Sequence, residues 1–376
     1  MKIGVLREKA DNETRVALIP SMLSILKKAN HDIFVETGAG AKAMFADEMY
    51  SEEGAEIVST PAELFEKADL ILKVQPLTDD EIAALREGHV YVGYMAPFTN
   101  VETLKKLAEK KVTSFAMDFI PRITRAQSMD ALSSQATASG YYAVLMAANH
   151  LPKFFPLLMT AAGTIAPATA LILGAGVAGL QAIATAKRLG AKVEAFDPRV
   201  AVKEQVMSLG AQFIEMEMPE DAETEGGYAK EATEEFIKKE HEAIGARLPK
   251  VDVVITTAQV FGKQAPLLIT EDMVKQLRTG SVIIDLAAEQ GGNCALTKPG
   301  KVYEKHGVKI DGTLNLPAKL PVHASQMYSK NVTNLIKHLY GAEGGKGHAK
   351  ADQTFGYGGW IPAGTRKLVH WQRGNY

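Results

Sequence analysis

Three glycines and an acid, set between two apolar runs, form the group of residues best suited to chemistry. Residues 171–197 read LILGAGVAGLQAIATAKRLGAKVEAFD, so an apolar run leads into a GxGxxG turn and a helix of small residues. This spacing predicts a strand, a tight turn, a helix and a second strand that ends at an acid. Such a unit binds a dinucleotide, because the free N–H groups at the helix start face the pyrophosphate. The alternative is a glycine-rich turn that binds nothing.

Each residue of this unit has a predicted role. Gly174 allows the tight turn, Gly176 lets the backbone approach a pyrophosphate, and Gly179 permits close packing of helix on strand. Asp197 would accept hydrogen bonds from the adenosine ribose, which favours NAD(H) over NADP(H).

A second polar cluster lies at residues 121–135, PRITRAQSMDALSSQ. Asp130 and Ser133 are three positions apart and so share one helix face. The cluster is either a helix cap with surface ion pairs or a polar arch over a nicotinamide ring. In the second interpretation Gln127 and Ser133 reach the carboxamide, while Arg122 and Asp130 set the local charge.

Composition excludes several classes of protein. The chain has 376 residues, which suggests two domains, and a net charge of −2, which gives no sign of nucleic-acid binding. A single cysteine, Cys294, excludes an internal disulfide framework, fits a reducing compartment and has no obvious histidine partner. The histidines lack the spacing of a metal site. The first residues, MKIGVLREK, lack the apolar core of a signal peptide, so we expect a cytoplasmic, soluble chain.

The uncharged stretch from Phe154 to Ala186 is long enough to span a membrane. It contains the glycine turn and two prolines, so a buried strand and a buried helix explain it better.

Alternation of strand-like and helical segments predicts an α/β fold with two doubly wound, mostly parallel, Rossmann-like sheets. Long helices at 128–150 and 325–341 would join the two domains and leave a cleft between them. We expect the N-terminal domain at 1–132 plus 325–376, and the dinucleotide-binding domain at 133–324. The predicted strands are 2–6, 32–37, 70–75, 90–95 and 112–117, then 169–174, 192–197, 212–216, 251–257, 281–288 and 308–312.

Two helix starts carry a specific signal. Thr60, Pro61 and Glu63 form a capping-box pattern with proline at the first helical position. Thr99 precedes a second helical pattern in the same way.

Two segments break the alternation. Residues 218–242 are highly charged around Gly227 and Tyr228, and form either a solvated loop with an exposed helix or a mobile flap whose tyrosine reaches a ligand. The segment after Gly347 is rich in glycine and aromatic residues, as an interface segment or a loosely ordered end would be.

The motifs RITRAQSMDALSS, GAGVAGLQAIATAKRLGA, VKEQVMSLGAQF, GGYAKE and ITEDMVKQLRTGSVIIDLAAEQGGN resemble the NAD(H)-binding subunits of proton-translocating nicotinamide nucleotide transhydrogenases. The resemblance runs from about residue 1 to 340. The wider superfamily includes alanine dehydrogenase, which shares the two-domain fold.

The resemblance implies roles for individual residues. The nicotinamide contacts would be Arg122, Gln127, Asp130 and Ser133. The pyrophosphate turn would include Ala175, Gly176 and Val177, the ribose contacts Asp197 and Arg199, and the mobile-loop tyrosine Tyr228. Gln259 stands where the family has a leucine that lines the adenine side.

The resemblance also implies partners. The subunit would be a peripheral dimer on the cytoplasmic face of a membrane. It would pass a hydride from NADH to NADP⁺ held by a beta subunit, and separate membrane-spanning subunits would couple the transfer to proton translocation.

Two other functions stay open. Alanine dehydrogenase needs a base and a cation for the carboxylate. Arg15 and Lys73 stand where its cations would be, but the place of its histidine is taken by Tyr94, whose ordinary pKa near 10 makes it a poor base. A module that senses NAD(H) without turnover is the third possibility, and a polar nicotinamide arch argues against it.

Overall fold

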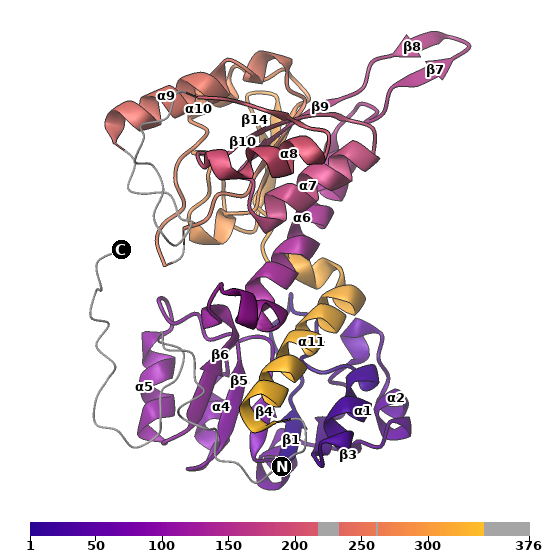
Figure 1. Cartoon of the computed structure of the whole chain (residues 1–376), viewed down its shortest axis with the longest axis vertical. Helices are drawn as coiled ribbons and strands as arrows, with labels where there is room; N and C mark the ends of the chain where they lie inside the picture. Colours follow the sequence, from indigo (N-terminus) through magenta and orange to yellow (C-terminus); the bar gives the residue numbers. More distant parts are fainter. Residues whose placement is uncertain (217–232, 261, 342–376) are drawn as a thin grey trace. The chain divides into compact units, whose positions relative to one another are not determined.

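The computed structural model describes residues 1–216, 233–260 and 262–341. The chain divides into two compact units. The first holds Met1–Gln135 and a C-terminal segment that starts at Pro317, and the second holds Ala136–Leu316. Each unit is an α/β sandwich built on a parallel sheet, which confirms the predicted fold class (Figure 1).

The first unit has a six-stranded sheet in which all neighbouring strands are parallel. In sheet order the strands are β3 (Glu56–Val58), β2 (Asp32–Glu36), β1 (Lys2–Val5), β4 (Leu70–Leu72), β5 (Val90–Gly93) and β6 (Thr113–Ala116). Strand β3 was not predicted, because three residues are too few for an alternating pattern to stand out. Successive strands are added on one side of β1 up to β3 and on the other side from β4 onward, and sheets of this kind bind ligands at such a switch in strand order.

Helices cover both faces of this sheet. They are α1 (Pro20–Lys28), α2 (Asp47–Glu52), α3 (Pro61–Lys67), α4 (Asp79–Ala84), α5 (Val101–Glu109) and α11 (Pro321–Tyr340), with 3₁₀ turns η1 (Ala41–Ala43), η2 (Met117–Phe119) and η3 (Thr124–Met129). Each face of the sheet packs against its own hydrophobic core, and alternate strand residues point to opposite faces. Ile3 and Val5 pack on one face, and Ile71 packs on the other. A Cβ on Gly4 would meet the Leu64 side chain at 2.6 Å, so α3 lies directly against β1.

The helix starts follow the predicted signals only in part. Thr60 does cap α3, accepting a hydrogen bond from the Glu63 N–H, but the Glu63 carboxylate returns to the Ser59 N–H rather than to Thr60. Thr99 is not a cap. Its hydroxyl donates to the Ala96 carbonyl, and Asn100 stands at the cap position of α5.

Helix α11 brings the end of the described chain back to the first unit (Figure 1). Tyr328 on this helix is fully buried, and its hydroxyl donates to the carbonyl of Lys73 at 3.1 Å. The Ser325 and Ser329 hydroxyls accept hydrogen bonds from the N–H groups of Val16 and Ile19. The helix is therefore tied to the segment after β1 by buried polar contacts as well as by apolar packing.

The second unit has a seven-stranded sheet, parallel except at one edge. In sheet order the strands are β11 (Gln212–Phe213), β10 (Lys192–Phe196), β9 (Thr169–Leu173), β12 (Val253–Thr256), β13 (Val282–Asp285), β15 (Val308–Asp311) and β14 (Val302–Lys305). The antiparallel β14 was not predicted. It alternates exposed and half-buried residues at the sheet edge and lacks the apolar run of the inner strands.

The helices of this unit are α6 (Ala131–His150), which starts in the first unit, α7 (Val177–Arg188), α8 (Lys203–Ser208), α9 (Glu234–Gly245) and α10 (Glu271–Val274), with 3₁₀ turns η4 (Val200–Val202), η5 (Leu248–Lys250) and η6 (Ala288–Gln290), and η7 (Leu316–Lys319) at the boundary with the first unit. The predicted helix over 128–150 is interrupted at its start. Residues Thr124–Met129 form a 3₁₀ turn, and the α-helix begins only after Asp130.

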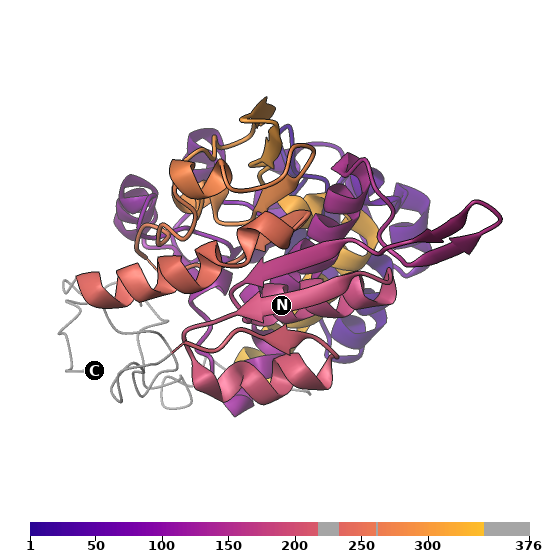
Figure 2. The same cartoon turned by 90° about the horizontal axis from the view of Figure 1, so that it is seen from above.

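The uncharged stretch from Phe154 is only partly buried. Residues 169–186 form the buried β9 and most of α7, as expected, but the residues before them form a two-stranded hairpin of β7 (Leu158–Thr160) and β8 (Gly163–Ile165). Figures 1 and 2 show this hairpin projecting from the body of the second unit. Met159 in the middle of β7 is 82% exposed, so the expectation of burial was wrong there. Among the described residues, no helix combines the length and the apolar character needed to cross a membrane.

Candidate functional site

The glycine turn has the predicted local structure. Strand β9 ends at Leu173, Gly174 follows with φ +97°, and α7 begins at Val177 with Gly176 at its cap position. The first N–H groups of α7 have no acceptor within the helix and point beyond its N-terminus. The positive end of the helix dipole adds to their attraction for an anion.

The three glycines have different surroundings and therefore different structural roles. A Cβ on Gly179 would lie 1.9 Å from the Gly174 carbonyl oxygen, and one on Gly174 would lie 2.6 Å from the Thr257 hydroxyl. A Cβ on Gly176 would meet no atom within 4 Å. Two of the glycines therefore let the chain pack on itself, and the third borders open space at the start of the helix.

Asp197 follows β10 and is tied to the turn. One carboxylate oxygen accepts from the Ala175 N–H at 2.7 Å, and the other accepts from the Arg199 N–H at 2.9 Å. The Arg199 guanidinium also bonds both oxygens, at 2.9 and 3.0 Å. Asp197 is 5% exposed and so lies buried beside the turn that a dinucleotide would occupy. The Ala175 N–H, predicted to face a pyrophosphate, is held by Asp197 in this structure.

The other predicted contacts of the second unit are less defined. The amide of Gln259, an exposed residue, donates to the Leu286 carbonyl at 2.8 Å, so it links the loop after β12 to the end of β13. Gly227 and Tyr228 lie outside the described residues, as does the tail after Gly347. Cys294 is buried, and burial raises the pKa of its thiol to about 11, which excludes it as a nucleophile at neutral pH.

The predicted nicotinamide residues lie in the first unit, on η3 and the start of α6. Asp130 is 7% exposed, and its carboxylate accepts from the Ser133 N–H at 2.9 Å and from the Ser133 hydroxyl at 2.5 Å. This is an N-cap, so the capping interpretation holds for these two residues. Arg122 and Gln127 are exposed on the chain before the cap. Capping fixes the Asp130 carboxylate at the start of α6.

Two buried ion pairs occupy the carboxyl ends of the first sheet. Arg15 is 3% exposed, and its Nη2 atom lies 2.6 Å from Glu13 Oε2, while Nη1 donates to Gln135 Oε1 at 2.9 Å. Lys73 directly follows β4, and its Nζ atom lies 2.7 Å from Glu81 Oε2. Sequence reasoning selected the two cations and missed the two acids that neutralise them.

The pKa directions agree with this pairing. Burial raises the pKa of Glu13, but the hydrogen bonds and charge of Arg15, together with a hydrogen bond from Gln75, outweigh burial and lower that pKa to about 2. Burial likewise opposes ionisation of Glu81, and the hydrogen bonds from Lys73 and the Thr78 N–H, together with the charges of Lys73 and Lys9, overcome it and lower the pKa. Both acids are therefore ionised at neutral pH and hold their cations inside the unit.

Tyr94, after β5, cannot serve as a base. Burial raises the pKa of its phenol further above its usual value. The hydroxyl oxygen is buried and has no hydrogen-bond partner among the described residues.

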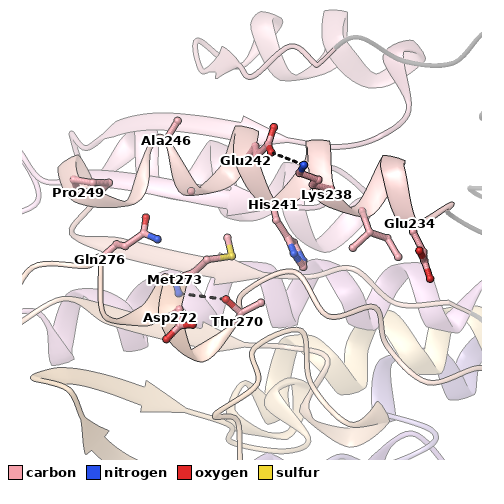
Figure 3. A pocket seen from close by; sticks show the side chains of 12 residues that line it. Glu234, Lys238, His241, Glu242, Ala246, Pro249, Thr270, Asp272, Met273 and Gln276 are labelled. Atoms are coloured by element: carbon pink, nitrogen blue, oxygen red, sulfur yellow. Dashed lines mark hydrogen bonds and ion pairs between the residues drawn. The ribbon is translucent and has the colours of Figure 1, made fainter.

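A groove of about 840 Å³ lies between α9 and the segment that holds α10. Figure 3 shows Lys238 and Glu242 on one wall, with Thr270 capping α10 on the other. It is lined by Glu234, Ile237, Lys238, His241, Glu242, Gly245, Ala246, Pro249, Thr270, Asp272, Met273 and Gln276. None of the predicted cofactor-binding residues that the structure describes lines this groove, so it is separate from the glycine turn.

The parallel sheet, the glycine turn and the acid after β10 define a Rossmann-type nucleotide-binding protein. The chain matches the family models "Alanine dehydrogenase/PNT, N-terminal domain" over residues 4–139 and "Alanine dehydrogenase/PNT, C-terminal domain" over residues 143–364. It therefore belongs to the alanine dehydrogenase/PNT family, a family of oxidoreductases.

The relatives include both transhydrogenase subunits and alanine dehydrogenases. The chain is 49% identical over 343 residues to a protein of Rhodospirillum rubrum named as the first portion of "NAD(P) transhydrogenase subunit alpha", covering 89% of each chain. It is 30% identical to "Alanine dehydrogenase 2" of Staphylococcus aureus, covering 95% of this chain and 92% of that one. The crystal structure of a transhydrogenase from Sinorhizobium meliloti matches with a TM-score of 0.82 and 41% identity, over 91% of this chain and 95% of the other.

The glycines give a matched pair of variants. Gly176→Ala adds a methyl group in open space at φ −73°, so we expect an unchanged melting temperature but NADH binding weaker by at least about tenfold. Gly179→Ala drives a methyl group into the Gly174 carbonyl and should lower the melting temperature as well. Calorimetric titration and thermal melting of both variants check this. NADH binding by Gly176→Ala at wild-type strength would show that the open space holds no part of the cofactor.

A buried acid beside the ion pairs makes stability depend on pH. Burial raises the pKa of Glu8 to about 8, against 4.5 for an exposed glutamate, although Lys73 acts in the opposite direction. Between these values the folded chain holds a proton that the unfolded chain has lost, so stability falls as pH rises. The slope from this group is at most about 1.4 kcal/mol per pH unit.

Glu8→Gln removes this ionisation and keeps the shape of the side chain. Denaturant titrations from pH 5 to pH 8 should show the variant gaining stability relative to wild type as pH increases. Parallel curves for the two proteins would show that Glu8 titrates normally in the fold.

Proposed function

We propose that this chain is the NAD(H)-binding subunit of a proton-translocating transhydrogenase. The observation that carries the proposal is the open space at Gly176, in front of the α7 N-terminus and beside the buried Asp197. The relatives named as transhydrogenase subunits support it, and so do the neutralised cations of the first unit.

In this proposal the second unit holds the ADP half of NAD(H). Gly174, Ala175, Gly176, Val177 and Gly179 form the pyrophosphate turn. Asp197 and Arg199 hold the adenosine ribose, and Gly227, Tyr228 and Gln259 complete that end of the site. For the ribose hydroxyls to bond Asp197, the Arg199 side chain must give up one of its two hydrogen bonds to the carboxylate.

The nicotinamide half would be held by the first unit, through Arg122, Gln127, Asp130 and Ser133. Bound NADH supplies the hydride, and NADP⁺ on the partner beta subunit accepts it. The chain's own residues have no proton to move at the reacting carbons. Their work is to hold the ring at contact distance from the acceptor, and positioning of this kind accounts for most of the catalysis in such a reaction. The Asp130 cap suits that role, because it fixes the start of α6 rigidly.

Alanine dehydrogenase activity is disfavoured by the buried ion pairs. A substrate carboxylate needs a cation that is free to bind it, but Arg15 is held by Glu13 and Lys73 by Glu81. Exchanging such an internal partner for a substrate would leave a carboxylate buried without its cation, which costs several kcal/mol. Tyr94, with its raised pKa, offers no base in place of a histidine. The first unit is therefore closed as an amino-acid site.

A membrane-spanning subunit would couple the transfer to proton translocation, and this chain would lie on the cytoplasmic face of the membrane through its partners. A pull-down with the tagged chain tests the assembly. Recovery of an NADP(H)-binding partner and a membrane protein is the expected outcome.

The β7–β8 hairpin supports a homodimer. Residues 154–165 carry no charge, and Phe154, Leu157 and Met159 are 55%, 52% and 82% exposed. Exposed apolar surface of this kind marks an interface, and a projecting hairpin can pack on a second copy of the chain.

The function is tested by mixing the chain with its NADP(H)-binding partner, NADH and an oxidised NADP⁺ analogue, and following nicotinamide absorbance. We expect transfer only when both proteins are present. Gln127→Ala should slow transfer by more than it weakens NADH binding, because the residue positions the ring. The exposed neighbour Ser128→Ala is the matched control and should leave both unchanged. Alanine-dependent reduction of NAD⁺ by the chain alone would contradict the proposal.

The dimer is tested by Met159→Asp, which places a charge in the middle of β7 on the hairpin. Light scattering after gel filtration should report a dimer for wild type and a monomer for the variant. At dilutions where wild type is also monomeric, the two proteins should have equal melting temperatures. An exposed position outside the hairpin, Met207→Asp, serves as the control. A dimer in both variants would place the interface elsewhere.

A further inference from the structure

Glu240 is a buried acid without a hydrogen-bond or ion-pair partner among the residues that the structure describes. It lies on α9 and is 6% exposed, although the other acids of this helix face solvent. Its carboxyl group makes no hydrogen bond or ion pair with any residue in the described part of the chain. Buried carboxyl groups are normally paired, because burying an unpaired charge is unfavourable. The position therefore calls for a reason beyond packing.

Helix α9 runs along β10 in a register that brings Glu240 to the end of that strand. Arg247 pairs with Glu194 at 3.6 Å, and Ile244 packs in the same core as Phe196. Residues 240, 244 and 247 form one stripe of the helix. Seven residues back along a helix span about 10.5 Å, and three residues forward along a strand span about 10 Å. This spacing brings Glu240 to the end of β10, the strand that Asp197 directly follows.

The electrostatics agree with this register. Burial raises the pKa of Glu240 to about 7, and the negative charge of Asp197 adds to the shift. The Asp197 oxygens are already bonded by Ala175 and Arg199, so Asp197 has no donor to offer Glu240. The place beside the predicted ribose site thus holds two carboxyl groups.

We propose that Glu240 is a second carboxyl group of the adenosine-ribose site and a determinant of cofactor specificity, excluding dinucleotides that carry a 2′-phosphate. The inference rests on the proposed NAD(H) function and deepens it. A ribose hydroxyl can bond to a carboxyl group in either protonation state. A 2′-phosphate brings about two negative charges close to Asp197 and Glu240, and repulsion at this range weakens binding strongly. Such a repulsive element is a common source of specificity. In a transhydrogenase it would keep NADPH out of the site for NADH.

The test is the ratio of the Kd values for NADPH and NADH, measured by calorimetric titration of the whole chain at about pH 8, where a carboxyl group with a pKa of about 7 is largely ionised. In Glu240→Gln, which keeps the shape and removes the charge, NADPH should bind about tenfold more tightly, while the Kd for NADH changes less than about twofold. Glu240→Asp keeps the charge and should retain most of the selectivity. Glu242→Gln, on the solvent side of the same helix, is the matched control and should keep the wild-type ratio.

Thermal melting accompanies each titration. Removal of an unpaired buried charge should leave the chain at least as stable as wild type. If Glu240→Gln does not fold, Glu240→Met offers a second uncharged side chain of similar length. A wild-type ratio in a folded, uncharged variant would overturn the assignment, and so would equal weakening of both dinucleotides. Failure of wild type to bind NADH would instead contradict the proposed function. The two failures are therefore distinguishable.

Discussion

Helix α7 approaches the end of β9 more closely than any side chain would allow, and the nucleotide site depends on this approach. With a methyl group on Gly179, the Gly174 carbonyl would be displaced and the first N–H groups of α7 would turn away from the open space at Gly176. Asp197 then couples the turn to β10 through the Ala175 N–H. One close contact thus sets the positions of the helix N-terminus, the strand end and the acid together.

The first unit shares the parallel architecture but uses its carboxyl ends differently. Where a binding domain would present free cations, Arg15 and Lys73 are paired with Glu13 and Glu81 inside the fold. In each pair the acid neutralises the cation inside the fold, so the cation is not presented to an anion although the charged residue is still there in the sequence.

Much of the fold was predictable, because strong local signals survive in the sequence. The inner strands are apolar runs, and the glycine turn and Pro61 mark helix starts without help from tertiary contacts. The short β3, the edge strand β14 and the exposed hairpin were missed because strand pairing, rather than local pattern, defines them. At the candidate site, spacing predicted the local structure around the glycines and Asp197. Glu240 was missed because its burial depends on how α9 lies on β10, although its spacing four residues before Ile244 was a usable signal.

The central claim is that a hydride passes directly from NADH on this chain to NADP⁺ on its partner. The most direct measurement uses NADH deuterated at the transferred position of C4, with both proteins in ordinary water, and mass spectrometry of the NADPH formed. Direct transfer predicts NADPH that carries the deuterium in full. NADPH without deuterium would show that the hydrogen exchanges with solvent on the way, and would contradict the account.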